Sequence, residues 1–132
     1  MVLSDLDYLT QQYIMTADEN EAFARRMLNR SSPSRADLRW AMVSLFYAAV
    51  HYVNGYLWEQ ARLEPKNHED RSRLINQWPD LSEFHLHYDR LNDAGWRARY
   101  SPTARLQRGD VQFLLVTDLQ AIKDSIRESL SV

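Results

Sequence analysis

The sequence predicts an all-α protein, an antiparallel bundle of four to five helices. Apolar residues recur with a helical period in several segments, and no segment alternates as a half-buried strand would. The 132 residues include only 3 Gly, fewer than the tight turns of a β-sandwich or barrel need. Hydrophobic residues make up 45% of the chain, enough for a core, so we expect one domain over residues 1–132.

Start and stop signals divide the chain into the expected helices. The first is predicted over residues 4–29, because a capping box at Ser4 and Asp7 precedes an apolar helical stripe. A second capping box at Thr16 and Glu19 would allow this helix to break and restart there, and we expect one long helix. The other helices are expected over residues 38–58, 68–77, 80–99 and from residue 110 onward, with caps at Ser34, Asn67, Asp80 and Asp110.

The segment over residues 38–58 is apolar on every face, with 16 of 21 residues apolar. A helix of this kind is either buried or spans a membrane. Because Ser44, His51 and Asn54 interrupt it, we expect no membrane span. A chain of this length rarely surrounds one helix completely, so the remaining surface predicts a partner subunit, most simply a homodimer.

His51 and Asn54 are the strongly polar residues of this central helix, and their spacing places them on one face. One interpretation is a satisfied polar pair in the core, which can fix the register of a helix–helix interface. The other interpretation is functional, with His51 lining a catalytic cleft together with Tyr47 and Arg97.

Composition limits the possible chemistry. The absence of Cys excludes disulfides, thiolate nucleophiles and Cys-ligated metals. The chain has no Glu-x-x-His or His-x-x-x-His pair, no glycine-rich phosphate loop and no Gly-x-Ser-x-Gly elbow, so we expect neither a metal nor a cofactor. The first residues do not resemble a signal peptide, which favours a cytoplasmic location.

The net charge of −2 predicts no overall attraction to nucleic acid, but one segment is locally basic. Residues 94–109, AGWRARYSPTARLQRG, contain four Arg and no Asp or Glu. One interpretation is that cations near the end of a helix stabilise its dipole. The other is a phosphate- or RNA-binding edge, where guanidinium groups hold phosphate and a ring stacks on a base. Its candidate residues are Arg97, Arg99, Tyr100, Arg105 and Arg108.

The stretch FYAAVHYVNGYLW in the central helix resembles the second helix of HEPN domains (higher eukaryotes and prokaryotes nucleotide-binding), which carries a Tyr-Ala-Ala-x-His-like motif. The order of elements is similar over residues 4–128, including the loop that ends in Asn67 and His68 and a later helix that ends in RARY. The resemblance implies a helical bundle that often dimerises. In active members an Arg followed by four to six residues and a His cleaves RNA without a metal, with His as general acid or base and Arg steadying the phosphate.

This chain departs from that pattern, because no His follows Arg97 or Arg99. The spacing recurs only from Arg62 to His68, across the loop after the central helix, so the candidate catalytic residues are His51, His68 and Arg62. We therefore expect a HEPN-like domain that binds RNA, a nucleotide or a protein partner without cleavage, in the defence or toxin–antitoxin setting that the resemblance implies. The alternatives are a metal-independent endoribonuclease and a structural dimerisation module.

Overall fold

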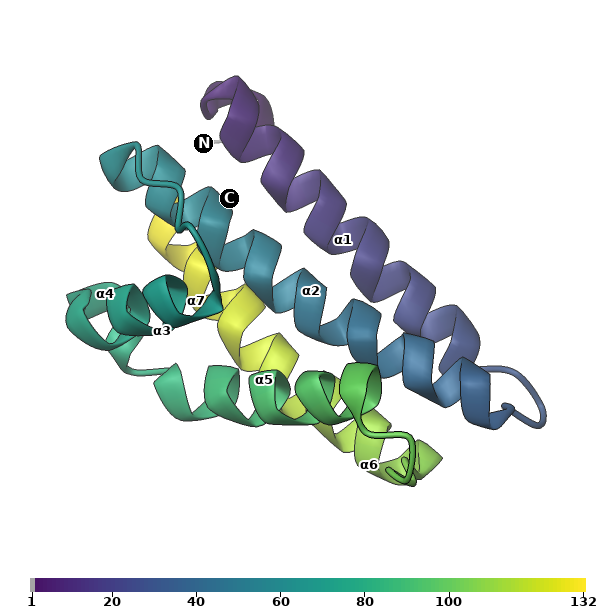
Figure 1. Ribbon diagram of the computed structural model, residues 1–132. Coiled ribbons are helices and arrows are strands. Elements are labelled where there is room, and N and C mark those ends of the chain that lie inside the picture. Colours follow the sequence, from purple (N-terminus) through teal and green to yellow (C-terminus); the bar gives the residue numbers. More distant parts are fainter. Residues whose placement is uncertain (1) are drawn as a thin grey trace.

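The computed structural model describes residues 2–132, and this part of the chain is helical with no strand, as predicted (Figure 1). α1 and α2 form an antiparallel hairpin, α5 crosses α2, and the run from α6 to α7 packs along a further side of α2. The elements are η1 (Leu3–Asp5), α1 (Tyr8–Leu28), α2 (Arg35–Ala61), α3 (His68–Gln77), α4 (Pro79–Ser82), α5 (His85–Tyr100), α6 (Arg108–Phe113), the π-helical η2 (Leu114–Leu119) and α7 (Gln120–Leu130).

The central helix α2 is buried by its own chain. Phe46, Tyr52 and Leu57 are 0% exposed, and α1, α5 and the last helices cover most of the surface of α2. The chain itself therefore covers most of this helix without a second copy, and the homodimer stays a prediction without that support. In residues 2–132 no helix has the length and apolarity to cross a membrane, which confirms the sequence prediction.

Two of the predicted helix caps are confirmed. The Ser34 side chain accepts a hydrogen bond from the Asp37 amide at 3.0 Å, and the Asp37 carboxylate accepts one from the Ser34 amide at 2.8 Å. The Asn67 side chain accepts a hydrogen bond from the Asp70 amide at 2.8 Å, so α3 begins at His68 as expected. Both side chains satisfy amides that the first turn of a helix leaves without partners.

The start of the first helix was predicted wrongly. α1 begins at Tyr8 because Asp7, rather than Ser4, caps it by accepting a hydrogen bond from the Leu9 amide at 3.0 Å. The indole of Trp58 donates to the same carboxylate at 2.8 Å and so holds this cap against α2. The helix then runs unbroken through Thr16, because a capping box cannot interrupt a helix whose apolar face is packed along its length.

Two later helix starts also differ from the prediction. Asp80 lies in the short helix α4 and accepts a hydrogen bond from the hydroxyl of Tyr56, so it does not open the following helix. That helix, α5, begins at His85. The last helical run begins at Arg108, and Asp110 lies in its first turn without acting as the cap.

α5 approaches α2 most closely at Gly95. A Cβ atom added at Gly95 would lie 2.8 Å from the Cβ of Phe46, so only glycine permits this approach. The crossing carries the end of α5, including Arg99, over the aromatic side chains of α2. The buried face of α5 and the preceding turn consists of Leu81, Phe84, Tyr88, Leu91, Gly95 and Ala98.

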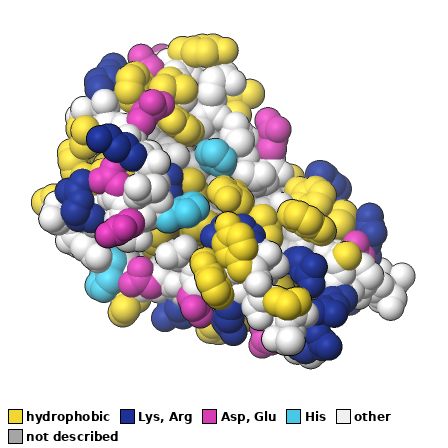
Figure 2. Space-filling model, viewed as in Figure 1, with side chains coloured by type: hydrophobic (Ala, Val, Ile, Leu, Met, Phe, Trp, Pro, Cys, Tyr) yellow, Lys and Arg dark blue, Asp and Glu magenta, His cyan; other side chains and the backbone are white. Residues whose placement is uncertain are grey.

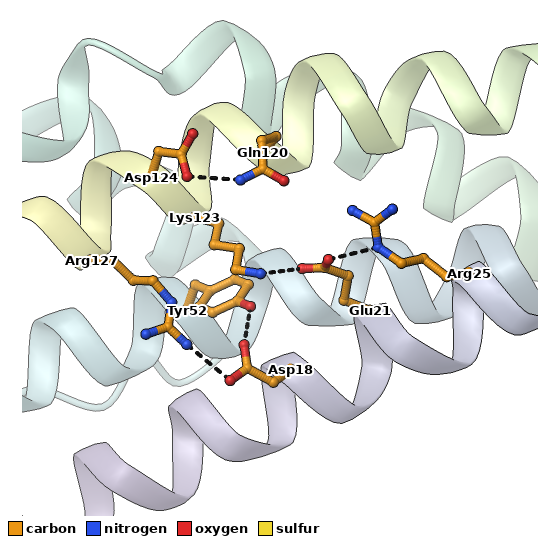
Figure 3. Close-up of polar contacts among 8 residues, drawn as sticks. All are labelled: Asp18, Glu21, Arg25, Tyr52, Gln120, Lys123, Asp124 and Arg127. Carbon is orange, nitrogen blue, oxygen red and sulfur yellow. Dashed lines mark hydrogen bonds and ion pairs between the residues drawn. The ribbon is translucent and has the colours of Figure 1, made fainter. Parts of the chain in front are cut away.

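Hydrogen bonds and ion pairs connect side chains of α1 to side chains of α7 (Figure 3). Glu21 on α1 accepts hydrogen bonds from Arg25 at 2.9 Å and from Lys123 on α7 at 3.0 Å. Burial alone would raise the pKa of Glu21, but the bonds from these two cations lower it. Beside this group, Asp18 accepts from Arg127 at 3.0 Å.

Candidate functional site

Two histidines from different elements lie near Tyr47. His51 follows Tyr47 by one turn of α2, and the two ring centroids are 6.5 Å apart. His68 at the start of α3 lies 6.3 Å from Tyr47 and 5.3 Å from Phe46, again between ring centroids. Both side chains are half-buried, and Figure 2 shows imidazoles near the middle of this face, beside hydrophobic side chains.

Arg71 is buried directly behind His68, with a relative exposure of 6%. Its Nε donates a hydrogen bond to Oδ1 of Asn54 at 3.0 Å, and its Nη1 lies 2.9 Å from Nδ1 of His68. Since a guanidinium only donates, Nδ1 of His68 is the acceptor and its proton is on Nε2. Asn54 is therefore satisfied by Arg71, and the polar pair that we expected between His51 and Asn54 does not form.

Arg99 reaches the same group from α5. Its guanidinium carbon lies 5.0 Å from the ring centroid of Phe46, 5.5 Å from that of Tyr47 and 5.3 Å from that of Tyr100. Within residues 2–132, the Nε and Nη1 atoms of Arg99 are buried and have no hydrogen-bond partner. The aromatic faces attract the cation but supply no oxygen or nitrogen acceptor for these donors.

The group formed by His51, His68, Arg71 and Arg99 is called the cationic cluster below. In residues 2–132 neither of its guanidinium groups takes part in an ion pair. Burial and the charge of Arg71 lower the pKa of His51, and burial, Arg71 and Arg99 lower that of His68. Buried positive charge without a counter-charge is costly, so this arrangement favours a bound anion.

The candidate binding residues of the basic segment lie in different surroundings in the structure. Arg97 lies on the opposite face of α5 from Arg99 and forms an exposed ion pair with Asp93 at 3.3 Å, so the arginine beside Tyr47 is Arg99 and not Arg97. Arg108 is structural, because it donates to backbone carbonyls of the turn between α1 and α2. Arg105 is exposed, as is Tyr100, whose ring centroid lies 5.6 Å from that of Trp96.

Arg62 and His68 do not form a catalytic pair in this structure. Arg62 ends α2 in the left-handed conformation with φ of 55°, and its guanidinium lies 5.5 Å from the ring of Trp58 and 3.7 Å from Asp7. The arginine that contacts His68 is Arg71, which sequence reasoning missed. The available signal was the spacing of His68 and Arg71, which places both on one face of a helix that Asn67 caps.

The basic segment over residues 94–109 meets a second basic segment, residues 25–39, at one end of the bundle. Arg35 donates to the Pro102 carbonyl, and Arg108 donates to the Arg30 carbonyl at 2.8 Å. Together the two segments hold nine of the sixteen Lys and Arg residues and one of the eighteen Asp and Glu residues. We call this the basic end; Figure 2 shows Lys and Arg side chains gathered there, next to the cationic cluster.

Comparisons of the chain with protein-family models, curated proteins and solved structures found no match. The HEPN resemblance therefore rests on the residues of the sequence, and it stays a prediction. Within residues 2–132, no three acidic or histidine side chains lie close enough together to hold a metal ion.

Proposed function

We propose that this protein is a HEPN-like RNA-binding domain whose cationic cluster holds a phosphate group of the strand. The observation that carries the proposal is the Arg99 guanidinium, whose buried Nε and Nη1 donors have no partner in residues 2–132. Phosphate oxygens accept such donors in charge-assisted hydrogen bonds. Arg71 supplies a second buried positive charge, and the imidazoles of His51 and His68 supply further donors at the same place.

Neighbouring side chains favour a strand of RNA over an isolated phosphate ion. Trp96 and Tyr100 are 55% and 64% exposed, and the Tyr100 ring lies against Arg99. An exposed aromatic pair beside a phosphate-binding guanidinium suits an unpaired base that stacks while its phosphate is held. The basic end extends the positive charge beyond the cluster. The HEPN resemblance adds the expectation of a role in a defence or toxin–antitoxin system.

Substitution of Arg99 tests the proposal. We expect Arg99→Gln to lower the affinity for single-stranded RNA about ten- to hundredfold, because hydrogen bonds to a charged group contribute about 1.5–3 kcal/mol. Fluorescence anisotropy with a short labelled RNA at low salt measures this. Arg97→Gln is the matched control: it removes the same charge two residues away, and we expect a clearly smaller loss. Equal losses in both variants, or no affinity in the wild type, contradict the proposal.

A metal-independent endoribonuclease is the second candidate, and the two imidazoles of the cluster favour it. One imidazole would take the proton of a 2′-hydroxyl while the 2′ oxygen attacks phosphorus. The other would give a proton to the departing 5′ oxygen, leaving a 2′,3′-cyclic phosphate. Burial and the charge of Arg71 lower the pKa of His51 and keep its imidazole neutral, so His51 is the available base at neutral pH.

This candidate predicts cleavage of RNA in the presence of a chelator, with cyclic phosphate ends. We expect the His51→Ala and His68→Ala variants to lose the activity and His85→Ala, which lies outside the cluster, to retain it. Mass spectrometry of the products identifies the ends. If RNA stays intact at a large excess of wild-type protein, the domain binds RNA without cleaving it.

A further inference from the structure

One stripe of α2 remains accessible and leads away from the cationic cluster. Trp40 is 56% exposed, and Ser44, Tyr47 and His51 are half-buried, while most residues between them are buried. The spacing of these four residues places them along one face of the helix. The stripe spans twelve residues, from Trp40 to His51, which is about 16 Å along the helix axis at 1.5 Å per residue. It therefore joins the cluster to the region of the basic end.

A groove between α1 and α2 lies over the distant half of this stripe. Its volume is about 450 Å³. The Arg26 guanidinium lies 5.9 Å from the ring of Phe23 on the α1 wall, and Trp40 stands on the α2 wall. The groove is lined mainly by Glu19, Asn20, Phe23, Arg26, Trp40 and Ser44.

The chemistry of these walls matches that of a nucleotide. The exposed indole offers a flat face on which a base can stack, and Arg26 offers a cation for phosphate. Asn20 and Glu19 provide donors and acceptors for the polar edge of a base. Two of the lining residues, Arg26 and Trp40, lie in or next to the segment 25–39 of the basic end, so the surrounding charge also favours an anionic ligand.

We propose that this groove is a second nucleotide subsite, in which an unpaired base stacks on Trp40 while a phosphate of the same strand occupies the cationic cluster. The inference rests on the proposed function and names its substrate class, a single strand several nucleotides long. An RNA strand is favoured over an acidic protein because the aromatic stripe is continuous with the phosphate site. Duplex RNA keeps its bases paired and so cannot offer one to Trp40.

The length dependence of binding tests the subsite. We would measure the affinity of AMP and of oligoadenylates of two, four and eight nucleotides, using competition against a labelled strand. The wild type is expected to gain affinity steeply with length. Trp40→Ala is expected to weaken binding of the eight-nucleotide strand about five- to hundredfold, as loss of one base stack does.

Tyr8→Ala is the matched control, because Tyr8 is an exposed aromatic residue of α1 outside the groove, with a relative exposure of 73%. Arg26→Gln is a second groove variant, expected to reduce both the affinity for the long strand and its salt dependence. Thermal unfolding shows whether each variant is folded. Trp40→Phe, which keeps a ring, is expected to retain part of the length dependence.

The possible outcomes separate the subsite from the proposed function. If Arg99→Gln weakens all ligands but Trp40→Ala and Arg26→Gln leave the length dependence intact, the subsite is overturned and the phosphate site stands. If the wild type binds none of the oligonucleotides, the proposed function fails as well. If Trp40→Ala weakens binding of polyglutamate but not of RNA, the groove serves an acidic protein partner and the inference is wrong.

Discussion

Arg71 and Arg99 supply the positive charge of the cationic cluster. Arg71 is almost fully buried, yet its hydrogen bonds go to an amide and an imidazole rather than to a carboxylate. Arg99 is held by three aromatic rings and keeps two donors unpaired in the described chain. The other buried charged side chains of residues 2–132, Glu21 and Asp118, are paired with cations, Glu21 with Lys123 and Asp118 with Arg90. The contrast points to an anion that is not part of the protein.

Under the proposed function, the two histidines make phosphate binding and protein stability respond to pH in opposite directions. The pKa values of His51 and His68 are lowered from 6.5, so both are neutral in the free protein at pH 7. A bound phosphate favours the imidazolium form, so binding takes up protons. The unfolded chain also binds these protons more readily than the free folded protein does, so stability of the free protein falls as the pH drops below about 6.5.

We therefore expect the affinity for a short RNA strand to rise several-fold between about pH 8 and pH 6, because the phosphodiester charge stays constant while the histidines titrate. Anisotropy titrations across this range measure the effect. The double variant with His51→Ala and His68→Ala should show a flatter profile, whereas His85→Ala should follow the wild type. An affinity independent of pH in the wild type would show that neither imidazole faces the phosphate.

At the scale of elements, the site depends on how α5 is placed between α2 and the last helical run. On one side Gly95 lets α5 approach Phe46. On the other, Asp118 of η2 is fully buried and lies 2.6 Å from Nδ1 of His87 and 2.6 Å from Nη2 of Arg90, both on α5. These contacts fix the direction of α5 and therefore the position of Arg99 over α2.

The close approach at Gly95 gives a stability prediction. Gly95→Ala should lower the free energy of unfolding by up to about 2 kcal/mol, because overpacking costs about 1–3 kcal/mol while helix propensity returns about 1 kcal/mol. It should also weaken RNA binding by displacing Phe46, on which Arg99 rests. Gly109→Ala is the control: no atom lies within 4 Å of the added Cβ, so stability should stay equal or rise. Denaturant unfolding compares them, and equal effects would rule out a steric role for Gly95.

At the scale of the whole molecule, basic and acidic residues are distributed unevenly, although the net charge is only −2. The two segments of the basic end are separated by more than fifty residues, and they meet because Arg35 and Arg108 bond to carbonyls across the interface. The rest of the chain carries seventeen of the eighteen acidic residues. A molecule charged in this way presents one end to a polyanion, whatever its total charge.

The sequence by itself determined the helical class, the caps at Ser34 and Asn67 and the burial of the central helix, because these follow from local hydrogen bonding and apolar periodicity. It also singled out His51, His68 and Arg99 as candidates. Only the tertiary structure decided which of them meet. The choice of Arg99 over Arg97 depends on which face of α5 turns toward α2, and Arg71 joins them because the loop after α2 folds α3 back against Phe46. Such contacts between distant segments leave no periodic signal in the chain.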